Sequence, residues 1–172
     1  GPWGQGIAVS PDGRRVAGEL WDGRNRSVWV GDLGSGRVDR LTFDADRFGP
    51  RWSPAGDRIA FTYFPDTPDD RGERTSMWWI AADGSEDARP IGARLNAYPT
   101  SFHPDGRSLF FHYAPGGTAD IRRVGLEGEG DDVAILQSPA FELWPVVSPD
   151  GRWLAYLSDA SGSMQLRLAP LP

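Results

Sequence analysis

The chain contains no cysteine and no lysine. Without cysteine there are no disulfides, no cysteine-ligated metal sites and no thiol nucleophiles. All 18 basic residues are arginine, so the sequence excludes a lysine Schiff base and the lysine of a phosphate-binding P-loop. A lack of cysteine fits a bacterial periplasmic protein and a cytosolic one equally well. The compartment is therefore left open.

Positive charge and long apolar runs are scarce. The formal net charge is −6 and the isoelectric point is about 4.9. Binding to a phosphate backbone needs clustered cationic side chains, so we expect no nucleic-acid partner. No apolar run approaches the roughly 20 residues of a transmembrane helix, and no signal-peptide pattern is present. We therefore expect no membrane insertion.

Motifs of catalysis and metal binding are also missing. There is no G-x-S-x-G elbow, no Walker A sequence and no kinase signature set. The two histidines, His103 and His112, have no third ligand at a metal-binding spacing, so hydrogen-bonded structural roles are the simpler explanation. Asp44-Ala45-Asp46 begins like an EF-hand loop but lacks the third ligand and the glycine. The sequence predicts no metal, no cofactor and no enzyme.

Four stretches of the chain are versions of one segment. They read GIAVSPDGRRVAGEL from Gly6, GPRWSPAGDRIAFTY from Gly49, YPTSFHPDGRSLFFHY from Tyr98 and WPVVSPDGRWLAYLSD from Trp144. An anchor position recurs after 43, 50 and 45 residues, at Ser10, Ser53, His103 and Ser148. Periods in this range are typical of β-propellers, which repeat one small sheet per blade.

Short strands and tight turns account for the rest of the pattern. Glycine and proline make 37 of 172 residues, a density that suits such strands rather than long helices. We predict an all-β fold, a β-propeller of about four four-stranded blades, either as a partial ring or as one completed by oligomerisation. One domain, 1–172, divides into repeats at approximately 6–44, 45–94, 95–138 and 139–172. The last repeat has only three strand candidates, which are 145–148, 153–158 and 164–169.

A Ser-Pro-Asp-Gly element joins the first two strand candidates of each repeat. Proline presets φ at about −65° for the first corner, aspartate bonds nearby backbone, and glycine accepts positive φ without steric cost. The second repeat has Ala55 in place of aspartate, and the third has His103 in place of serine. Both changes are tolerable in a structural turn, which is how we interpret the element. Its residues are Ser10, Pro11, Asp12, Gly13, Ser53, Pro54, Gly56, His103, Pro104, Asp105, Gly106, Ser148, Pro149, Asp150 and Gly151.

This turn, followed by an Arg-x-(Ile/Val/Leu)-Ala-(Phe/Tyr) strand, resembles the WD40-like (PD40) repeat of TolB-type propellers. The resemblance extends over nearly the whole chain. Residues 40–43 followed by 50–53 look like the blade junction of those repeats. Residues 144–162 and 167–172 look like the last blades of propellers attached to bacterial serine/threonine kinases. Such propellers usually have six or more blades, whereas this chain has about four. The resemblance implies a non-catalytic binding or sensor module.

Loops on a rigid scaffold are the usual place for binding. In a propeller, the loops before the first strand and those between the second and third strands share one face. Trp21 and Tyr98 are expected to be exposed there, whereas Trp52, Trp144 and Trp153 are expected in blade cores. The acidic loop 64–75 suits a cation or a partner, although a solvated loop is the simpler explanation. The candidate binding residues of this face are Trp21, Arg47, Asp66, Asp69, Asp70, Tyr98 and Glu142.

Three functions remain open. The one we favour is a non-catalytic binding, sensor or scaffold module that holds a protein, peptide or small ligand at the channel mouth. The second is a propeller fragment or engineered chain that self-assembles into a closed ring; Gly1-Pro2 resembles the remnant of an affinity tag. The third is an enzyme whose carboxylates line the channel. An open strand edge in the last blade favours self-association, and a homodimer gives eight blades in one ring.

Overall fold

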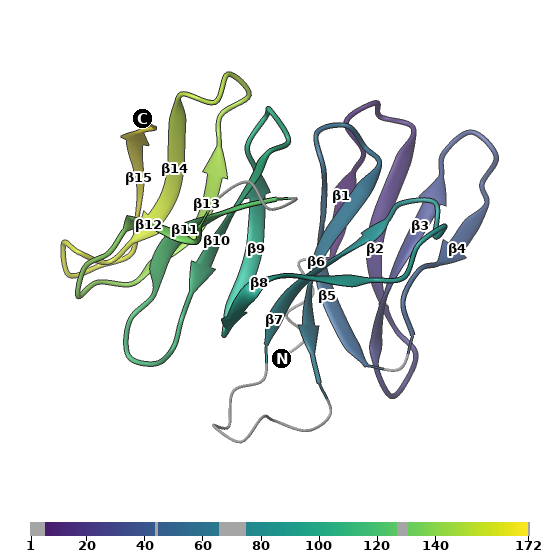
Figure 1. Ribbon diagram of the computed structural model, residues 1–172, viewed down its shortest axis with the longest axis horizontal. Helices are drawn as coiled ribbons and strands as arrows, with labels where there is room; N and C mark the ends of the chain where they lie inside the picture. Colours follow the sequence, from purple (N-terminus) through teal and green to yellow (C-terminus); the bar gives the residue numbers. More distant parts are fainter. Residues whose placement is uncertain (1–5, 44, 66–74, 127–130, 172) are drawn as a thin grey trace.

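The computed structural model describes residues 6–43, 45–65, 75–126 and 131–171. These residues form fifteen strands and no helix. Consecutive strands pair antiparallel into three four-stranded sheets and one three-stranded sheet (Figure 1). The predicted all-β propeller built from small sheets is confirmed. None of the described segments is a helix long and apolar enough to cross a membrane.

Each sheet is one blade. Blade 1 contains β1 (Ile7–Val9), β2 (Arg15–Trp21), β3 (Arg26–Asp32) and β4 (Val38–Arg40), and blade 2 contains β5 (Asp46–Trp52), β6 (Arg58–Phe64), β7 (Ser76–Ala81) and β8 (Arg89–Leu95). Blade 3 contains β9 (Ala97–Phe102), β10 (Ser108–Tyr113), β11 (Asp120–Gly125) and β12 (Val133–Leu136), and blade 4 contains β13 (Glu142–Val147), β14 (Trp153–Ser158) and β15 (Gln165–Pro170).

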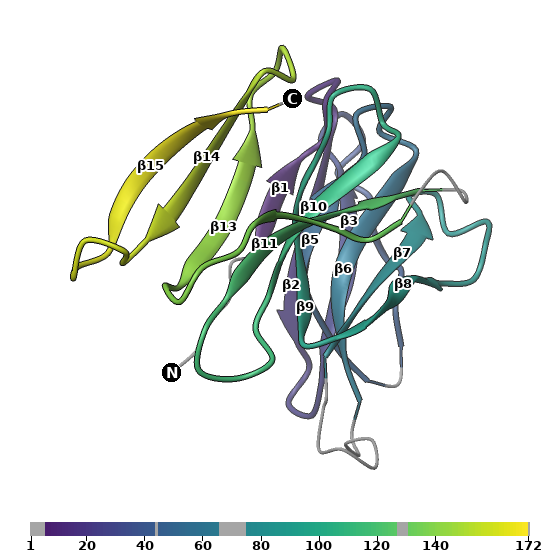
Figure 2. The ribbon, with the colours of Figure 1, turned by 60° about the vertical axis from the view of Figure 1, so that its left-hand side comes forward.

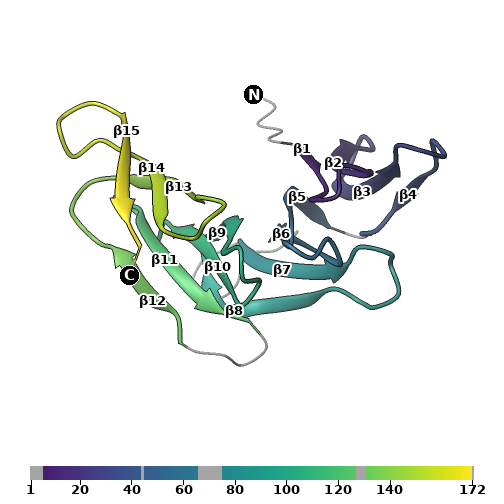
Figure 3. The same cartoon turned by 90° about the horizontal axis from the view of Figure 1, so that it is seen from above.

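The blades follow one another in an arc around a central axis (Figure 3). The first strand of every blade, β1, β5, β9 or β13, lies innermost, and neighbouring first strands are in contact along the series. The arc does not bring blade 4 back to blade 1, and β15 forms the outer edge of blade 4 (Figure 2). The axis-facing surface is therefore built from the first strands and the ends of the second strands.

The Ser-Pro-Asp-Gly elements form the hairpins between first and second strands. In blade 1 the Ser10 hydroxyl donates to Asp12 Oδ1 at 2.6 Å and accepts from the Arg15 amide at 2.8 Å. Blade 2 has no aspartate two residues after the anchor, and there the Ser53 hydroxyl donates instead to Asp57 Oδ1 at 2.7 Å. The closing glycines adopt positive φ, between 69° and 74° in all four turns. Local hydrogen bonds thus close each turn within its own hairpin.

Apolar cores lie between blades, one at each of the three junctions. The residue before the anchor shows how repeat position decides burial. Trp52, Phe102 and Val147 occupy this position in blades 2 to 4, pack against the preceding blade and are 8–9% exposed. Val9 occupies it in blade 1 and is 59% exposed. The same residue class is therefore buried or exposed according to whether a preceding blade is present.

Some expectations about tryptophans and loops were wrong. Trp52 is buried as expected, but Trp144 and Trp153 are 44% and 47% exposed because one faces the axis and the other faces away from blade 3. Before the first strand of blade 3, where a loop was expected, the chain is almost entirely strand, with only Asn96 between β8 and β9. Arg122 is buried, and its Nε donates to Asp132 Oδ1 at 2.6 Å.

Candidate ligand site at the ring axis

The candidate binding residues do not gather at one place. Trp21 ends β2 and is exposed, whereas Arg47 lies in β5, with its guanidinium 5.3 Å from the ring centre of Tyr63. Glu142 begins β13 and is buried. These residues and Tyr98 lie in strands, not in the loops that the sequence indicated. Asp66, Asp69 and Asp70 lie outside the described residues.

Among the described candidates, Tyr98 lines a cavity at the axis, whereas Arg47 lines a different cavity. The axis cavity has a volume of about 210 Å³ and lies where β5, β9 and β13 approach one another. Its lining lies near the ends of the sheets at which the first strands begin, because Phe48 pairs with Thr62 and Tyr98 pairs with His112. This is the propeller face predicted for binding. The cavity is lined by Phe48, Gly49, Arg51, Thr62, Tyr98, Pro99, Thr100, His112 and Trp144.

His112 forms the buried wall of the cavity. Its side chain is only 9% exposed, and its ring stacks on Tyr98 with 4.8 Å between ring centres and 12° between planes. Burial lowers the pKa of His112 to about 4, and the positive charge of Arg51 adds to this shift. The imidazole is therefore neutral near neutral pH. Within the described residues, its Nδ1 atom is buried without a hydrogen-bond partner.

Among the described residues that line the cavity, Arg51 alone carries a formal charge. Its Nε donates to the Thr100 carbonyl of blade 3 at 3.0 Å, and its Nη1 donates to the Pro50 carbonyl at 2.9 Å. Burial lowers the pKa of the guanidinium, and the negative charge of Glu19 opposes this shift. Glu19 itself accepts a hydrogen bond from the Gly49 amide at 2.8 Å. The bond from Arg51 to Thr100 joins blades 2 and 3, and the bond from Gly49 to Glu19 joins blades 1 and 2.

Trp144 forms the blade 4 side of the cavity in an unfavourable backbone conformation. Its φ is 52°, a left-handed value that is an outlier for a bulky residue. Counted from the anchor, Trp144 occupies the same repeat position as Gly49, which has φ 65°, and both residues precede a buried proline. A tryptophan thus occupies a position whose left-handed backbone conformation favours glycine. Strain of this kind clusters at functional sites.

Glu142 belongs to a separate polar cluster between blades 3 and 4. Burial raises the pKa of its carboxyl; the hydrogen bond from Ser138 at 2.9 Å opposes the shift, and the charge of Asp120 adds to it. Within the described part of the chain, Glu142 Oε2 and Arg167 Nε are buried without hydrogen-bond partners. No group of three or more acidic or histidine side chains positioned for a metal ion occurs among the described residues.

Sequence reasoning missed three of the important cavity residues, which are Arg51, His112 and Trp144. Arg51 and His112 lie in strands of different repeats and come together only when the blades pack. Trp144 carried a usable signal, because alignment of the repeats sets Trp144-Pro145 against Gly49-Pro50. A bulky residue at a glycine position argues against a simple core role.

Comparison with known proteins bears on the fold. No family model matches the chain. TolB from Acinetobacter baumannii matches with a TM-score of 0.81 at 20% identity, over 96% of this chain and 40% of that one. A putative TolB from Agrobacterium tumefaciens matches with a TM-score of 0.77 at 20% identity, over 96% of this chain and 57% of that one.

Peptidases share the same architecture at lower similarity. A puromycin-hydrolyzing peptidase of Mycobacterium tuberculosis matches with a TM-score of 0.68 at 22% identity, over 94% of this chain and 29% of that one. The chain therefore spans between about a quarter and three fifths of these three structures. Identities this low show a shared propeller fold and nothing further about chemistry.

Proposed function

We propose that the chain is a non-catalytic, TolB-like binding module that holds a protein, peptide or small ligand at the axis. The observation that carries the proposal is Trp144, held at φ 52° with its indole on the wall of the cavity. A conformation that costs of order 1–3 kcal/mol persists only where the surroundings enforce it, and such positions cluster at ligand sites. The repeat resemblance extends the proposal to the PD40 repeats of bacterial propellers, including those attached to serine/threonine kinases.

The enzyme alternative has less support. The peptidase neighbours share a sheet arrangement, and fold alone does not bring a nucleophile or an acid–base pair to this chain. Glu19, whose charge reaches Arg51 at the axis, is engaged by the Gly49 amide. That hydrogen bond gives the carboxylate a structural role between blades 1 and 2.

A peptide-display selection against the folded protein tests the binding proposal. Selected peptides should bind at least about tenfold more weakly to Trp144→Ala, a loss of about 1.4 kcal/mol. Trp21→Ala is the matched control, because Trp21 is a more exposed tryptophan that does not line the cavity. Peptides that bind Trp144→Ala as tightly as the unchanged protein would place the ligand elsewhere.

A second candidate function is self-association into a closed ring, and a specific observation favours it. Blade 1 and blade 4 each leave one blade face exposed, and both faces are apolar. The face of blade 1 presents Ile7, Val9, Leu20 and Val38, and that of blade 4 presents Val146, Trp153, Leu166 and Leu168. We propose that the second copy of the chain covers them, giving eight blades in a homodimer.

The three junctions between blades within the chain show how such apolar faces are buried when a neighbouring blade is present. Ala17, Ala60 and Phe110 occupy the repeat position that faces the following blade, and all three are at most 1% exposed. Ala155 occupies this position in blade 4 and is half-exposed. The exposed faces thus have the composition of a blade junction without the neighbour. A head-to-tail contact between copies joins the two different faces, and cyclic symmetry closes it.

A further inference from the structure

We propose that the axis cavity recognises a carboxylate, which Arg51 binds while the aromatic residues around it hold an apolar body. The inference rests on the proposed binding function and names the chemical class of the ligand. The carboxylate has two possible sources, a small free acid or the C-terminus of a peptide. Both present the same group, so the experiment below separates them.

The guanidinium of Arg51 keeps donors and charge that its neighbours leave unmatched. A guanidinium has five N–H donors, and carbonyl oxygens accept only two of them here, through Nε and Nη1. A carbonyl satisfies a donor but does not neutralise the charge. Within the described residues Arg51 makes no ion pair; burial penalises its charge, and the charge of Glu19 opposes this penalty without direct contact. Such a cation favours an anion, and a carboxylate matches the planar fork of its remaining donors.

His112 is more than nine-tenths buried and lines the same cavity. Its Nδ1 atom has no hydrogen-bond partner among the described residues, and an unpaired buried polar atom asks for an explanation. The ring is neutral and stacked on Tyr98, so it adds no second positive charge beside Arg51. The site therefore offers one fixed cation and a polar, uncharged wall.

The cavity is small and partly aromatic. Phe48, Tyr98 and Trp144 supply aromatic surface beside the guanidinium. A volume of about 210 Å³ lies below the roughly 300–1,000 Å³ of pockets for drug-sized ligands. It suits one ring or one terminal residue. The whole chain carries a net charge of −6, so general attraction of anions does not explain binding at this point.

The experiment compares acids with their amides by isothermal titration calorimetry. The small probes are 3-phenylpropionate and 3-phenylpropionamide, and the peptide probes are N-acetyl-Gly-Phe with a free or an amidated C-terminus. In the unchanged protein each acid should bind at least about tenfold more tightly than its amide. Tighter binding of the peptide acid than of phenylpropionate indicates a peptide terminus as the source, and the reverse order indicates a small acid.

Two variants assign the effect to Arg51. Arg51→Gln should remove the preference for acids, whereas Arg51→Lys should retain part of it, because lysine keeps the charge and loses the fork. If Arg51→Gln does not fold, the acid and amide pair on the unchanged protein decides alone. Equal binding of acid and amide, or acid binding that survives Arg51→Gln, overturns the inference. So does failure of both acids to bind at millimolar concentration.

The failure of this inference is distinguishable from that of the proposed function. If selected peptides require Trp144 but bind equally well with an amidated C-terminus, the proposed binding function is supported and the proposed carboxylate recognition is contradicted. If peptide binding depends neither on Trp144 nor on the C-terminal group, both proposals are contradicted.

Discussion

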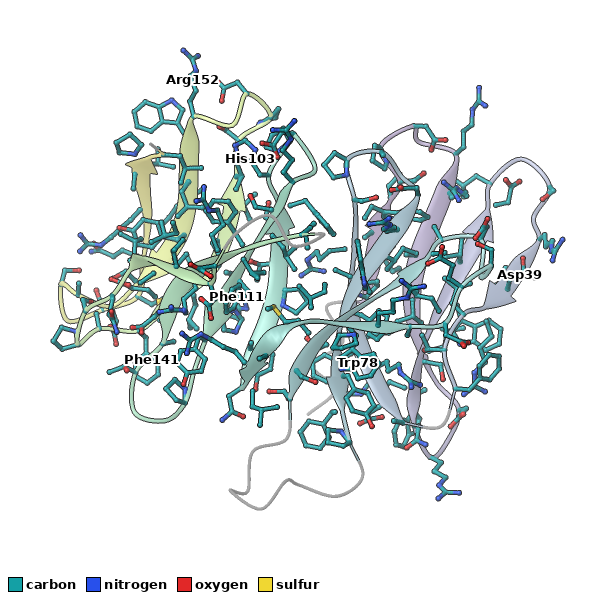
Figure 4. The ribbon with its side chains drawn as sticks, viewed as in Figure 1. Asp39, Trp78, His103, Phe111, Phe141 and Arg152 are labelled. Atoms are coloured by element: carbon teal, nitrogen blue, oxygen red, sulfur yellow. The ribbon has the colours of Figure 1, made fainter. Side chains whose placement is uncertain are left out.

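The Nε2 atom of His103 lies 2.8 Å from the position that a Cβ would take on Gly151. His103 anchors the blade 3 turn and Gly151 closes the blade 4 turn, so the contact joins two neighbouring hairpins. Both turns lie at the same end of the molecule, where Figure 4 labels His103 and Arg152. The anchor residue of the other three repeats is serine, and the larger imidazole of blade 3 reaches the next turn.

The contact predicts a larger cost for Gly151→Ala than for Gly13→Ala. Both glycines have positive φ, 73° and 69°, but nothing lies within 4 Å of a Cβ on Gly13. The strained backbone should cost about 1–2 kcal/mol at either site, and the steric clash should add about 1–3 kcal/mol at Gly151. Urea unfolding of both variants measures the difference. Measured against the single variant His103→Ser, the added change Gly151→Ala should cost no more than Gly13→Ala; a persistent excess would contradict the contact.

Strain at Trp144 predicts an inverted order for two substitutions. Trp144→Gly should be more stable than Trp144→Ala by about 1 kcal/mol, because glycine accepts φ 52° and alanine does not. At ordinary strand positions alanine is the better residue, so the order is diagnostic. Thermal melts in parallel measure it, with the pair Val146→Gly and Val146→Ala as the control in the same strand. If alanine is the more stable residue at both positions, the backbone at Trp144 is not strained.

His112 predicts a pH dependence of stability. Its pKa is about 4 in the folded protein against 6.5 ordinarily. Between these values the unfolded chain binds a proton that the folded chain does not, so stability rises with pH and is lost as pH falls from about 6.5 to about 4. The full effect is about 3 kcal/mol. Arg51, the charged neighbour of the ring, stays a cation in this window and does not supply the slope.

His112→Leu is the variant that isolates this effect. Leucine has a precedent, because Leu157 occupies the same repeat position in blade 4. Urea unfolding at pH 4.0, 5.0, 6.0 and 7.0 measures the free energy of unfolding of both proteins. The difference, variant minus unchanged protein, should increase by up to about 3 kcal/mol as the pH falls. Parallel pH profiles of the two proteins would mean that His112 titrates normally.

The sequence predicted the fold well because the information is local and repeated. The turn at Ser10 forms through the neighbouring Asp12 and Arg15, and each hairpin repeats this chemistry within a few residues. The blade sheets follow from such hairpins in series. Even the altered second repeat keeps the turn, because Asp57 replaces the missing partner of Ser53.

The site was harder to predict because its residues meet only across blades. The Nε atom of Arg51 donates to the carbonyl of Thr100, which lies 49 residues later in the chain. A local sequence pattern does not reveal a contact between residues so far apart in the sequence. The exposure of Trp153 depends on the presence of a neighbouring blade rather than on its own strand. Its apolar character predicted a place in a blade core, but no described blade covers that side of blade 4.

Self-association gives the last prediction. Light scattering at micromolar concentration should give twice the chain mass of 18.8 kDa, because two exposed apolar faces of complementary type are costly to leave in water. Leu168→Glu places a charge on the face of blade 4 and should give the single-chain mass. Phe43→Glu is the control, since Phe43 is 54% exposed and lies beside Ile80 and Ala88 at the junction of blades 1 and 2, away from both exposed faces. A single-chain mass for the unchanged protein would show that a second copy does not cover these faces. A double mass that Leu168→Glu leaves unchanged would place the contact elsewhere.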